Sequence, residues 1–173
     1  AIITMIEPNS GHIVYDFGID LASFKEKELL LKYMNLNLYD HQGTHFAPHL
    51  VSKRMWNRVG GFSEEFNPGI ASDPDFNMKL WNMGVRLFKG LGKSRVYHFS
   101  SVSLRKKAWN NGAKIFLLKW GMSIKFFKKY YLKSDTPFKG PLTEPEKNLN
   151  YYFDLIKCKL AYVFHSILSK RNA

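Results

Sequence analysis

Hydrophobic and polar positions in the first forty residues alternate between strand-like and helix-like patterns. Apolar runs at residues 1–6 and 12–17 predict two short strands, separated by a loop around Pro8 to Gly11. Apolar residues then recur at helical spacing through 23–37, which predicts a helix with Ser23 as its N-cap. This order of strands and a helix indicates an α/β or α+β domain.

Five more elements are predicted between residues 47 and 101. They are a strand at 47–52, a short helix at 53–59, a helix at 74–83 and strands at 85–91 and 94–101. Gly60 and Gly61 should end the short helix, because glycine readily adopts the positive φ angles of a helix end. Gly84 should end the second helix in the same way.

The pattern after Asn110 is that of amphipathic helices. One apolar stripe consists of Phe116, Leu117, Trp120, Ile124, Phe127 and Tyr131. Gly121 is predicted to divide this segment into two helices, with Ser123 capping the second. A linker at 134–145 leads to a last helix with a predicted Thr143–Glu146 capping box. The apolar residues along one side of that helix are Leu149, Tyr152, Ile156, Leu160, Val163 and Ile167.

Composition fits one folded domain of 173 residues, with 45% hydrophobic and 16% aromatic content. The single cysteine, Cys158, excludes an internal disulfide and a cysteine-based zinc site, and it fits a reducing compartment. The chain shows no signal-peptide pattern, and the last apolar run is too short to span a bilayer. We therefore expect a cytoplasmic protein, and the start at Ala1 suggests a piece of a longer chain.

The formal net charge is +12, and much of it lies in one block. Nine Lys or Arg residues and no acidic residue occur from Arg105 to Lys133. Such a block favours an anionic partner: phosphate groups, nucleic acid or an anionic membrane surface. A solvated helix face explains the same block equally well.

Asp73, Pro74 and Asp75 open the predicted helix at 74–83. Proline suits the first helical position, Asp73 suits the N-cap, and Asp75 suits the first turn beside the helix dipole. A carboxylate held at this point can also act as a general base, although the helix N-terminus should lower its pKa. The two roles do not exclude each other, so Asp73 is both a capping and a catalytic candidate.

Other candidate residues lie on either side of this helix. His98 could bind a divalent metal ion that also holds a diphosphate, with Ser100 and Arg105 facing phosphate oxygens. A packed or surface histidine is the alternative interpretation. Gly60, Gly61 and Phe62 form a predicted turn with an aromatic lid. Trp81 is a core candidate whose ring type also stacks on sugars.

Several of these segments together resemble a known family. The segments are "GGFSEEF" at 60–66, "SDPDF" at 72–76, Gly84 and "VYHF" at 96–99. Their order and spacing resemble the second half of the catalytic domain of family 2 glycosyltransferases, which have the GT-A fold, over about residues 47–133. Ser72 departs from the pattern, because the family commonly has glutamate there.

The resemblance implies a role for each matching residue. Asp73 would be the general base that deprotonates the acceptor hydroxyl in an inverting transfer. Asp75, Trp81 and the turn of Gly60, Gly61 and Phe62 would contact the acceptor. The diphosphate of the donor would bind His98, Ser100 and Arg105. His98 would also help to bind Mg²⁺ or Mn²⁺.

The resemblance also implies an organisation for the chain. Residues 1–104 would form the acceptor-side part of a GT-A domain with a mixed sheet and flanking helices. A basic amphipathic segment at 105–133 and a linker with a final helix at 134–173 would follow. The donor-binding half, with its D-x-D metal motif, would lie before Ala1, so the chain alone should bind a sugar nucleotide poorly.

The implied partners are a nucleotide-diphosphate sugar, and a glycan or lipid-linked acceptor. A peripheral contact with the anionic inner face of the membrane is also expected, and nucleic acid is not. The rival interpretation is a non-catalytic basic module that binds an anionic membrane or nucleic acid through residues 105–133.

Overall fold

The computed structural model describes residues 1–171 except 10, 37–38, 44–46, 68–69 and 100–109. Its strands are β1 (Ile2–Glu7), β2 (Ile13–Val14), β3 (His41–Gln42) and β4 (Lys89–Tyr97). Its α-helices are α1 (Glu26–Lys32), α2 (Lys53–Val59), α3 (Ser72–Asn82), α4 (Gly112–Trp120), α5 (Ile124–Phe126) and α6 (Leu149–Arg171). A 3₁₀ turn, η1 (Glu64–Phe66), precedes α3, and a π-helical segment, η3 (Phe127–Leu132), continues α5.

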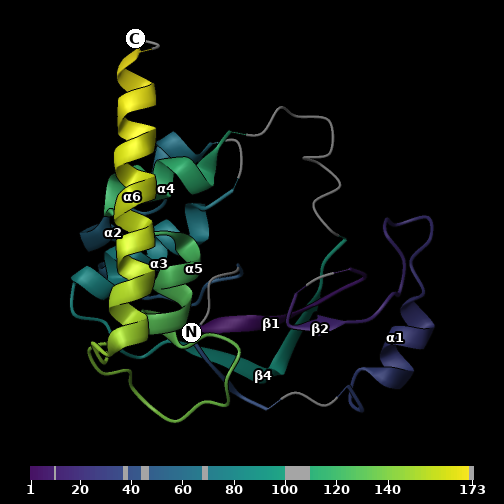
Figure 1. The fold of residues 1–173 in the computed structure, drawn as a ribbon. Coiled ribbons are helices and arrows are strands. Elements are labelled where there is room, and N and C mark those ends of the chain that lie inside the picture. Colours follow the sequence, from purple (N-terminus) through teal and green to yellow (C-terminus); the bar gives the residue numbers. More distant parts are fainter. Residues whose placement is uncertain (10, 37–38, 44–46, 68–69, 100–109, 172–173) are drawn as a thin grey trace.

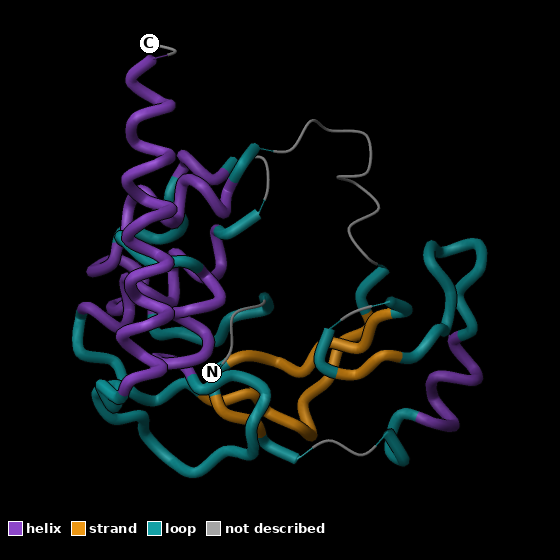
Figure 2. The backbone as a smooth tube through the Cα atoms, in the orientation of Figure 1, coloured by secondary structure: helices purple, strands orange, loops and turns teal. Residues whose placement is uncertain are grey.

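The arrangement is a mixed α/β fold. Helices α2 to α6 gather at one end of a small sheet, and α1 lies at the other end (Figure 1). Figure 2 shows the strands side by side, extending to the right from the lower part of a body that consists mainly of helix. The predicted mixed sheet with flanking helices is therefore confirmed at this level.

The sheet has the strand order β2-β1-β4-β3. The central strand β1 runs parallel to both β2 and β4, and β3 is antiparallel to β4. Five of the six β1 residues are buried, which explains their nearly continuous apolar run.

Two strand predictions in this region need correction. Residues 89–91 and 94–97 of the predicted strands at 85–91 and 94–101 belong to one strand, β4, and residues 100–101 lie outside the described residues. The register of β4 against β1 shifts between the pairs Ile3↔Leu91 and Thr4↔Arg95. This irregularity around Gly92 has the sequence signature of a turn, which explains the error. In the predicted strand at 47–52, only His49 forms a bridge, and its partner is Ile2.

Local signals placed several helix ends correctly. The Ser52 hydroxyl accepts the Met55 backbone N–H at the start of α2, and Gly60 ends that helix in the left-handed region with φ 76°. Gly121 ends α4 with φ 68°, and the Ser123 hydroxyl accepts the Phe126 N–H at the start of α5. These helix ends depend mainly on nearby residues, which is why the sequence predicts them.

Three predicted caps are wrong. Helix α1 begins at Glu26, and the Ser23 hydroxyl instead accepts the N–H groups of Ile19 and Asp20. Helix α6 begins after Asn148, whose side chain accepts the Tyr151 N–H, so the Thr143–Glu146 box does not cap it.

The third correction concerns α3. It begins at Ser72, and its N-cap is Ala71 in the left-handed region with φ 83°. Asp73 therefore lies inside the first turn and does not cap the helix. Pro74 follows it, two positions later in the helix than predicted.

The main core surrounds α3. Its fully or nearly fully buried side chains include Phe66, Phe76, Trp81, Phe88, Phe116, Phe127 and Leu132. Most side chains of the predicted stripe at residues 116–131 therefore pack inside the protein. A second, smaller cluster joins Tyr151 and Cys158 of α6 to Leu117 and Phe126.

Helix α6 packs against the rest of the protein with the side opposite to the predicted apolar stripe. Tyr151 and Cys158 are buried, whereas Leu149 is 88% and Leu160 is 67% exposed. Among the described residues, no helix is long and apolar enough to cross a membrane.

Gly112, the first residue of α4, offers a test of packing around α3. A Cβ at this position would lie 1.8 Å from the Ile70 carbonyl oxygen, so the backbone must move to accept one. We expect Gly112→Ala to destabilise the fold by about 2 kcal/mol, although alanine is the better helix former. Urea denaturation measures this change, and a neutral or stabilising effect would contradict the close approach. Gly84→Ala is the control, because its Cβ would meet open space and only the positive φ should cost stability.

Candidate functional site

Asp73 lies in the first turn of α3 with its side chain partly exposed. Its side chain is 28% exposed, and its Oδ1 lies 3.7 Å from Nδ1 of His49. The His49 ring packs edge-on against Phe62 and Phe76, with ring centroids 5.9 Å and 5.2 Å away. One side of the carboxylate thus meets aromatic surface, while the exposed part remains accessible to a small hydroxyl compound.

Burial dominates the electrostatics of Asp73 and His49. It raises the pKa of Asp73 to about 6, against the opposing effect of a backbone hydrogen bond from Ala47. Burial also lowers the pKa of His49 to about 4. At neutral pH the histidine is therefore uncharged, and its contact with the Asp73 carboxylate is not an ion pair.

This result corrects one expectation from the sequence. The helix N-terminus was expected to lower the pKa of Asp73, but desolvation outweighs the helix dipole and moves the pKa upward. A carboxylate with a pKa of about 6 is ionised at pH 7 and is more basic than an ordinary aspartate. Asp73 therefore has the protonation behaviour of a general base.

Asp75 has a different environment, although it is only two residues away. Its side chain is completely buried, and it accepts hydrogen bonds from the Ser63 hydroxyl at 2.7 Å and from Nε1 of Trp120 at 2.8 Å. Nζ of Lys119 lies 2.9 Å from Oδ1, and Nζ of Lys79 lies 3.7 Å from Oδ2. Asp75 thus joins the segment before η1 to α3 and α4, and it presents no surface to an acceptor.

The turn after α2 places an aromatic surface near Asp73. Gly60 and Gly61 both have positive φ, and a Cβ on Gly61 would lie 2.7 Å from the Trp56 ring. Only glycine fits here, and the turn brings Phe62 to 5.2 Å from Trp56 between ring centroids. Phe62 is 43% exposed and touches His49, so a sugar ring could stack on this surface beside Asp73.

Trp81, the other aromatic candidate, lies in the core. It is 4% exposed, and its ring packs against Phe88 with the Arg86 guanidinium 3.9 Å from its centroid. It therefore offers almost no surface to an acceptor.

His98 directly follows β4 at the carboxyl edge of the parallel strands. Its Nδ1 lies 2.7 Å from Oε1 of Glu7, the last residue of β1, and its backbone N–H donates to the Ile6 carbonyl. The imidazole is 42% exposed, whereas the Glu7 side chain is only 6% exposed. A buried carboxylate thus orients a solvent-accessible imidazole, whose Nε2 is left available to a ligand.

The structure does not bring Asp73 and His98 together. His49, which contacts Asp73, bridges Ile2 at the start of β1, whereas His98 bonds to Ile6 near its end. At about 3.3 Å per residue, these two points on the strand are about 13 Å apart. Ser100 and Arg105, the other predicted diphosphate ligands, lie outside the described residues.

The described residues do not form a metal site by themselves. Within this part of the chain, no group of three or more His, Cys, Asp or Glu side chains could hold a metal ion. Glu7 and His98 supply one carboxylate and one imidazole, which are too few for a closed Mg²⁺ or Mn²⁺ site. We therefore assign no chemical step to the predicted metal ion.

Sequence reasoning missed the two residues that accompany the candidates, His49 and Glu7. His49 lies in a segment predicted as a strand, and nothing near it in sequence signals that it meets Asp73. Glu7 had a weak signal, because an acidic residue at the end of an apolar strand often lies at a ligand-binding edge.

Comparisons of this chain with protein-family models, curated proteins and solved structures found no match. The case for a function therefore rests on the geometry around Asp73 and on the sequence resemblance.

Proposed function

We propose that this chain carries the general base and acceptor side of an inverting glycosyltransferase of the GT-A type. The observation that carries the proposal is the Asp73 carboxylate, which is partly exposed and has a pKa of about 6. Functional sites are where burial shifts the pKa of a carboxyl group toward neutrality.

The chemistry required of Asp73 is a single proton transfer. An acceptor hydroxyl beside the carboxylate attacks the anomeric carbon of a nucleotide-diphosphate sugar, and the bond from that carbon to the diphosphate oxygen breaks. The hydroxyl proton passes to Asp73, and the nucleoside diphosphate leaves with the bonding electrons. Attack from the face opposite the leaving group inverts the anomeric centre. The neutral state of His49 leaves the negative charge of Asp73 uncompensated and available for the proton.

The main rival explanation of Asp73 is that it only starts α3. Ala71 occupies the N-cap, and Asp73 lies in the first turn with most of its side chain removed from water. A carboxylate at the N-cap or on the surface would give the dipole benefit without the desolvation cost. The position of Asp73 therefore costs stability, which favours a function beyond helix initiation.

The alternative of a non-catalytic basic module stays a prediction. Residues 105–109, which supply three of its nine basic side chains, lie outside the described residues. No observed contact favours nucleic acid over another anion at this segment.

The proposed function is tested by incubating the chain with a panel of nucleotide-diphosphate sugars and mixed glycan acceptors. Because the chain alone should bind a sugar nucleotide poorly, we expect slow release of nucleoside diphosphate at high donor concentration. This release should depend on the acceptor and give a product of inverted anomeric configuration. Because Asp73 must be ionised, the rate should fall about tenfold per pH unit below pH 6 and level off above pH 7.

A second measurement separates acceptor binding from donor binding. Quenching of tryptophan fluorescence by glycan acceptors should report on Trp56, which lies next to Phe62. Acceptor binding without turnover would show that donor binding is the missing step. Transfer with retention of the anomeric configuration would overturn the proposal. Absence of both acceptor binding and turnover would also overturn it.

A further inference from the structure

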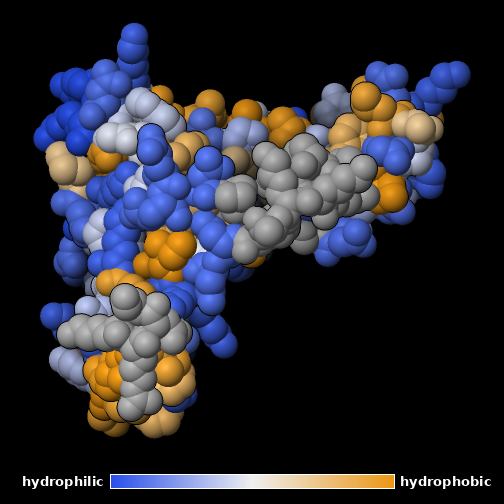
Figure 3. All heavy atoms as spheres, turned by 90° about the horizontal axis from the view of Figure 1, so that it is seen from above, coloured by the Kyte–Doolittle hydropathy of each residue, from blue (hydrophilic) through white to orange (hydrophobic). Residues whose placement is uncertain are grey.

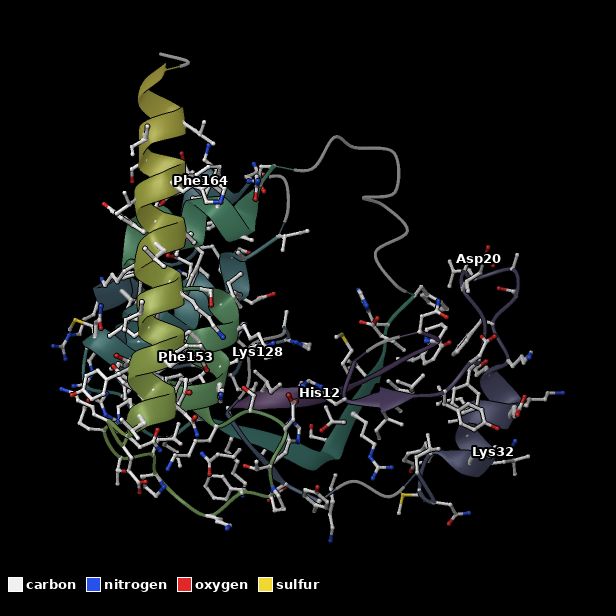
Figure 4. The ribbon with its side chains drawn as sticks, in the orientation of Figure 1. His12, Asp20, Lys32, Lys128, Phe153 and Phe164 are labelled. Carbon is white, nitrogen blue, oxygen red and sulfur yellow. The ribbon has the colours of Figure 1, made fainter. Side chains whose placement is uncertain are left out.

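The outward side of α6 is apolar along most of the helix. We call this surface the outer face, and its members are each 49% to 88% exposed. They are Leu149, Tyr152, Phe153, Ile156, Leu160, Val163, Phe164 and Ile167. Figure 4 shows Phe153 and Phe164 on α6, which lies in front of α4 and α5 in this view. Viewed along the helix from its C-terminal end, hydrophobic atoms gather on the projecting lobe beneath that end (Figure 3).

The outer face is a continuous stripe and not a scatter of single residues. At 100° per residue, its eight members fall within an arc of about 120°, and at 1.5 Å per residue they extend for about 27 Å. Tyr151 and Cys158, which are buried against α4 and α5, lie on the opposite side of the helix. Helix α6 is therefore apolar on two sides, and its packing against the body uses only one of them.

Charge around the outer face is positive. Lys157 and Lys159 are exposed and fall on its two borders, and Nζ of Lys157 lies 4.1 Å from the centroid of the Phe153 ring. Asp154 turns toward the body, where it pairs with Lys129 at 2.8 Å and accepts the Tyr130 hydroxyl. Its other oxygen lies 3.6 Å from Nζ of Lys157, which is 60% exposed. None of the eight outer-face residues is acidic, so the surface has an apolar centre and basic edges.

The apolar centre and basic edges of the outer face favour an anionic lipid surface as its partner. Lysines bordering an apolar stripe can extend to lipid phosphates while the stripe enters the acyl region. A second copy of the chain would instead bring like charges together, against a net charge of +12 on each copy. No described helix is suited to cross a bilayer, whereas a helix lying in the plane of its surface needs only one apolar side.

We propose that α6 docks the protein on an anionic membrane by lying in the plane of the lipid surface, with the outer face inserted. This inference is independent of glycosyl transfer. It also assigns the expected peripheral membrane contact to α6 and not to the apolar stripe of residues 116–131, whose side chains are mostly packed inside the protein.

Flotation of the full chain with vesicles tests the proposal. We expect binding to phosphatidylglycerol–phosphatidylcholine vesicles and much weaker binding to phosphatidylcholine alone. Ile156→Gln with Leu160→Gln should weaken binding about a hundredfold, because two inserted side chains are lost. Lys157→Gln with Lys159→Gln should weaken it about thirtyfold, and that loss should shrink at high salt.

The matched control is Leu30→Gln with Leu31→Gln on α1, where the two leucines are 60% and 79% exposed. This variant carries the same chemical change far from α6 and should bind vesicles as the unaltered chain does. All substituted residues are exposed, and circular dichroism of each variant checks that folding is retained.

Two outcomes would overturn the proposal. One is vesicle binding that the α6 and α1 variants weaken equally. The other is absence of binding to the anionic vesicles. If light scattering then shows a dimer that the Ile156→Gln, Leu160→Gln variant dissolves, the outer face binds a second copy instead.

Discussion

Replacing Asp73 with asparagine is expected to lower kcat/KM for sugar transfer by a hundred- to ten-thousandfold, the usual contribution of a general base. Asparagine keeps the shape of the side chain but cannot take the proton of an acceptor hydroxyl. The measurement is nucleoside-diphosphate release at pH 7.5 with saturating acceptor. Turnover within a few-fold of the unaltered chain would show that the base assignment is wrong.

The same substitution should stabilise the fold, which separates catalysis from structure. The folded pKa of Asp73 is about 6, above its ordinary value of 3.8, so the folded chain holds a proton that the unfolded chain has released between these pH values. The free energy of unfolding therefore falls as the pH rises from 3.8 to about 6. At pH 7 the fold bears the full cost of burying the ionised Asp73 carboxylate. Asp73→Asn should recover up to about 3 kcal/mol at pH 7 and nearly nothing below pH 4.

Asp154→Asn is the matched control for both measurements. Asp154 is 29% exposed, close to the 28% of Asp73, but hydrogen bonds from Lys129 and Tyr130 lower its pKa to about 2. Its replacement should leave turnover unchanged and should not stabilise the protein. Stabilisation by Asp154→Asn as large as that by Asp73→Asn would mean that removal of any acidic charge has this effect.

Replacing Asp75 with alanine should give the largest loss of stability, about 3–5 kcal/mol. The substitution removes the acceptor of the Ser63 hydroxyl and of Trp120 Nε1, and it leaves Lys119 without its buried partner. Urea denaturation measures the loss, and the Trp120 indole N–H should exchange faster with deuterium. Asp75→Asn should cost less, because an amide oxygen can still accept from Trp120.

The Asp75 experiment also tests the predicted acceptor contact of this residue. A structural role predicts that the remaining folded Asp75→Asn protein keeps the KM for acceptor. A raised KM without a loss of stability would instead place Asp75 at the acceptor, against its complete burial.

The sequence predicted the features that depend on neighbouring residues. Gly60, Gly121 and Ser123 were assigned correctly, because a cap needs only the first or last turn of its helix. The cap at Asp73 failed because Ala71 adopts a left-handed φ, a conformation that non-glycine residues rarely take and that the sequence did not signal.

Features that depend on residues far apart in the chain could not be predicted from the sequence. The raised pKa of Asp73 depends on burial by distant parts of the chain, among them the segment of His49, a residue 24 positions earlier. The packing side of α6 was ambiguous, because both the outer face and the side containing Tyr151 and Cys158 are apolar. Strand β3 has only two residues, and it exists through pairing with β4 nearly fifty positions later.

The long separation of β1 and β4 has a consequence for how the chain reaches this structure. The central parallel pair joins strands that are more than eighty residues apart, whereas α4, α5 and α6 meet through much nearer contacts. Closing the longer loop costs more entropy before any strand pairing offsets it. The helices should therefore assemble early and the sheet late, so that the contact of Asp73 on α3 with His49, in the segment paired with β1, forms only in the last stage of folding.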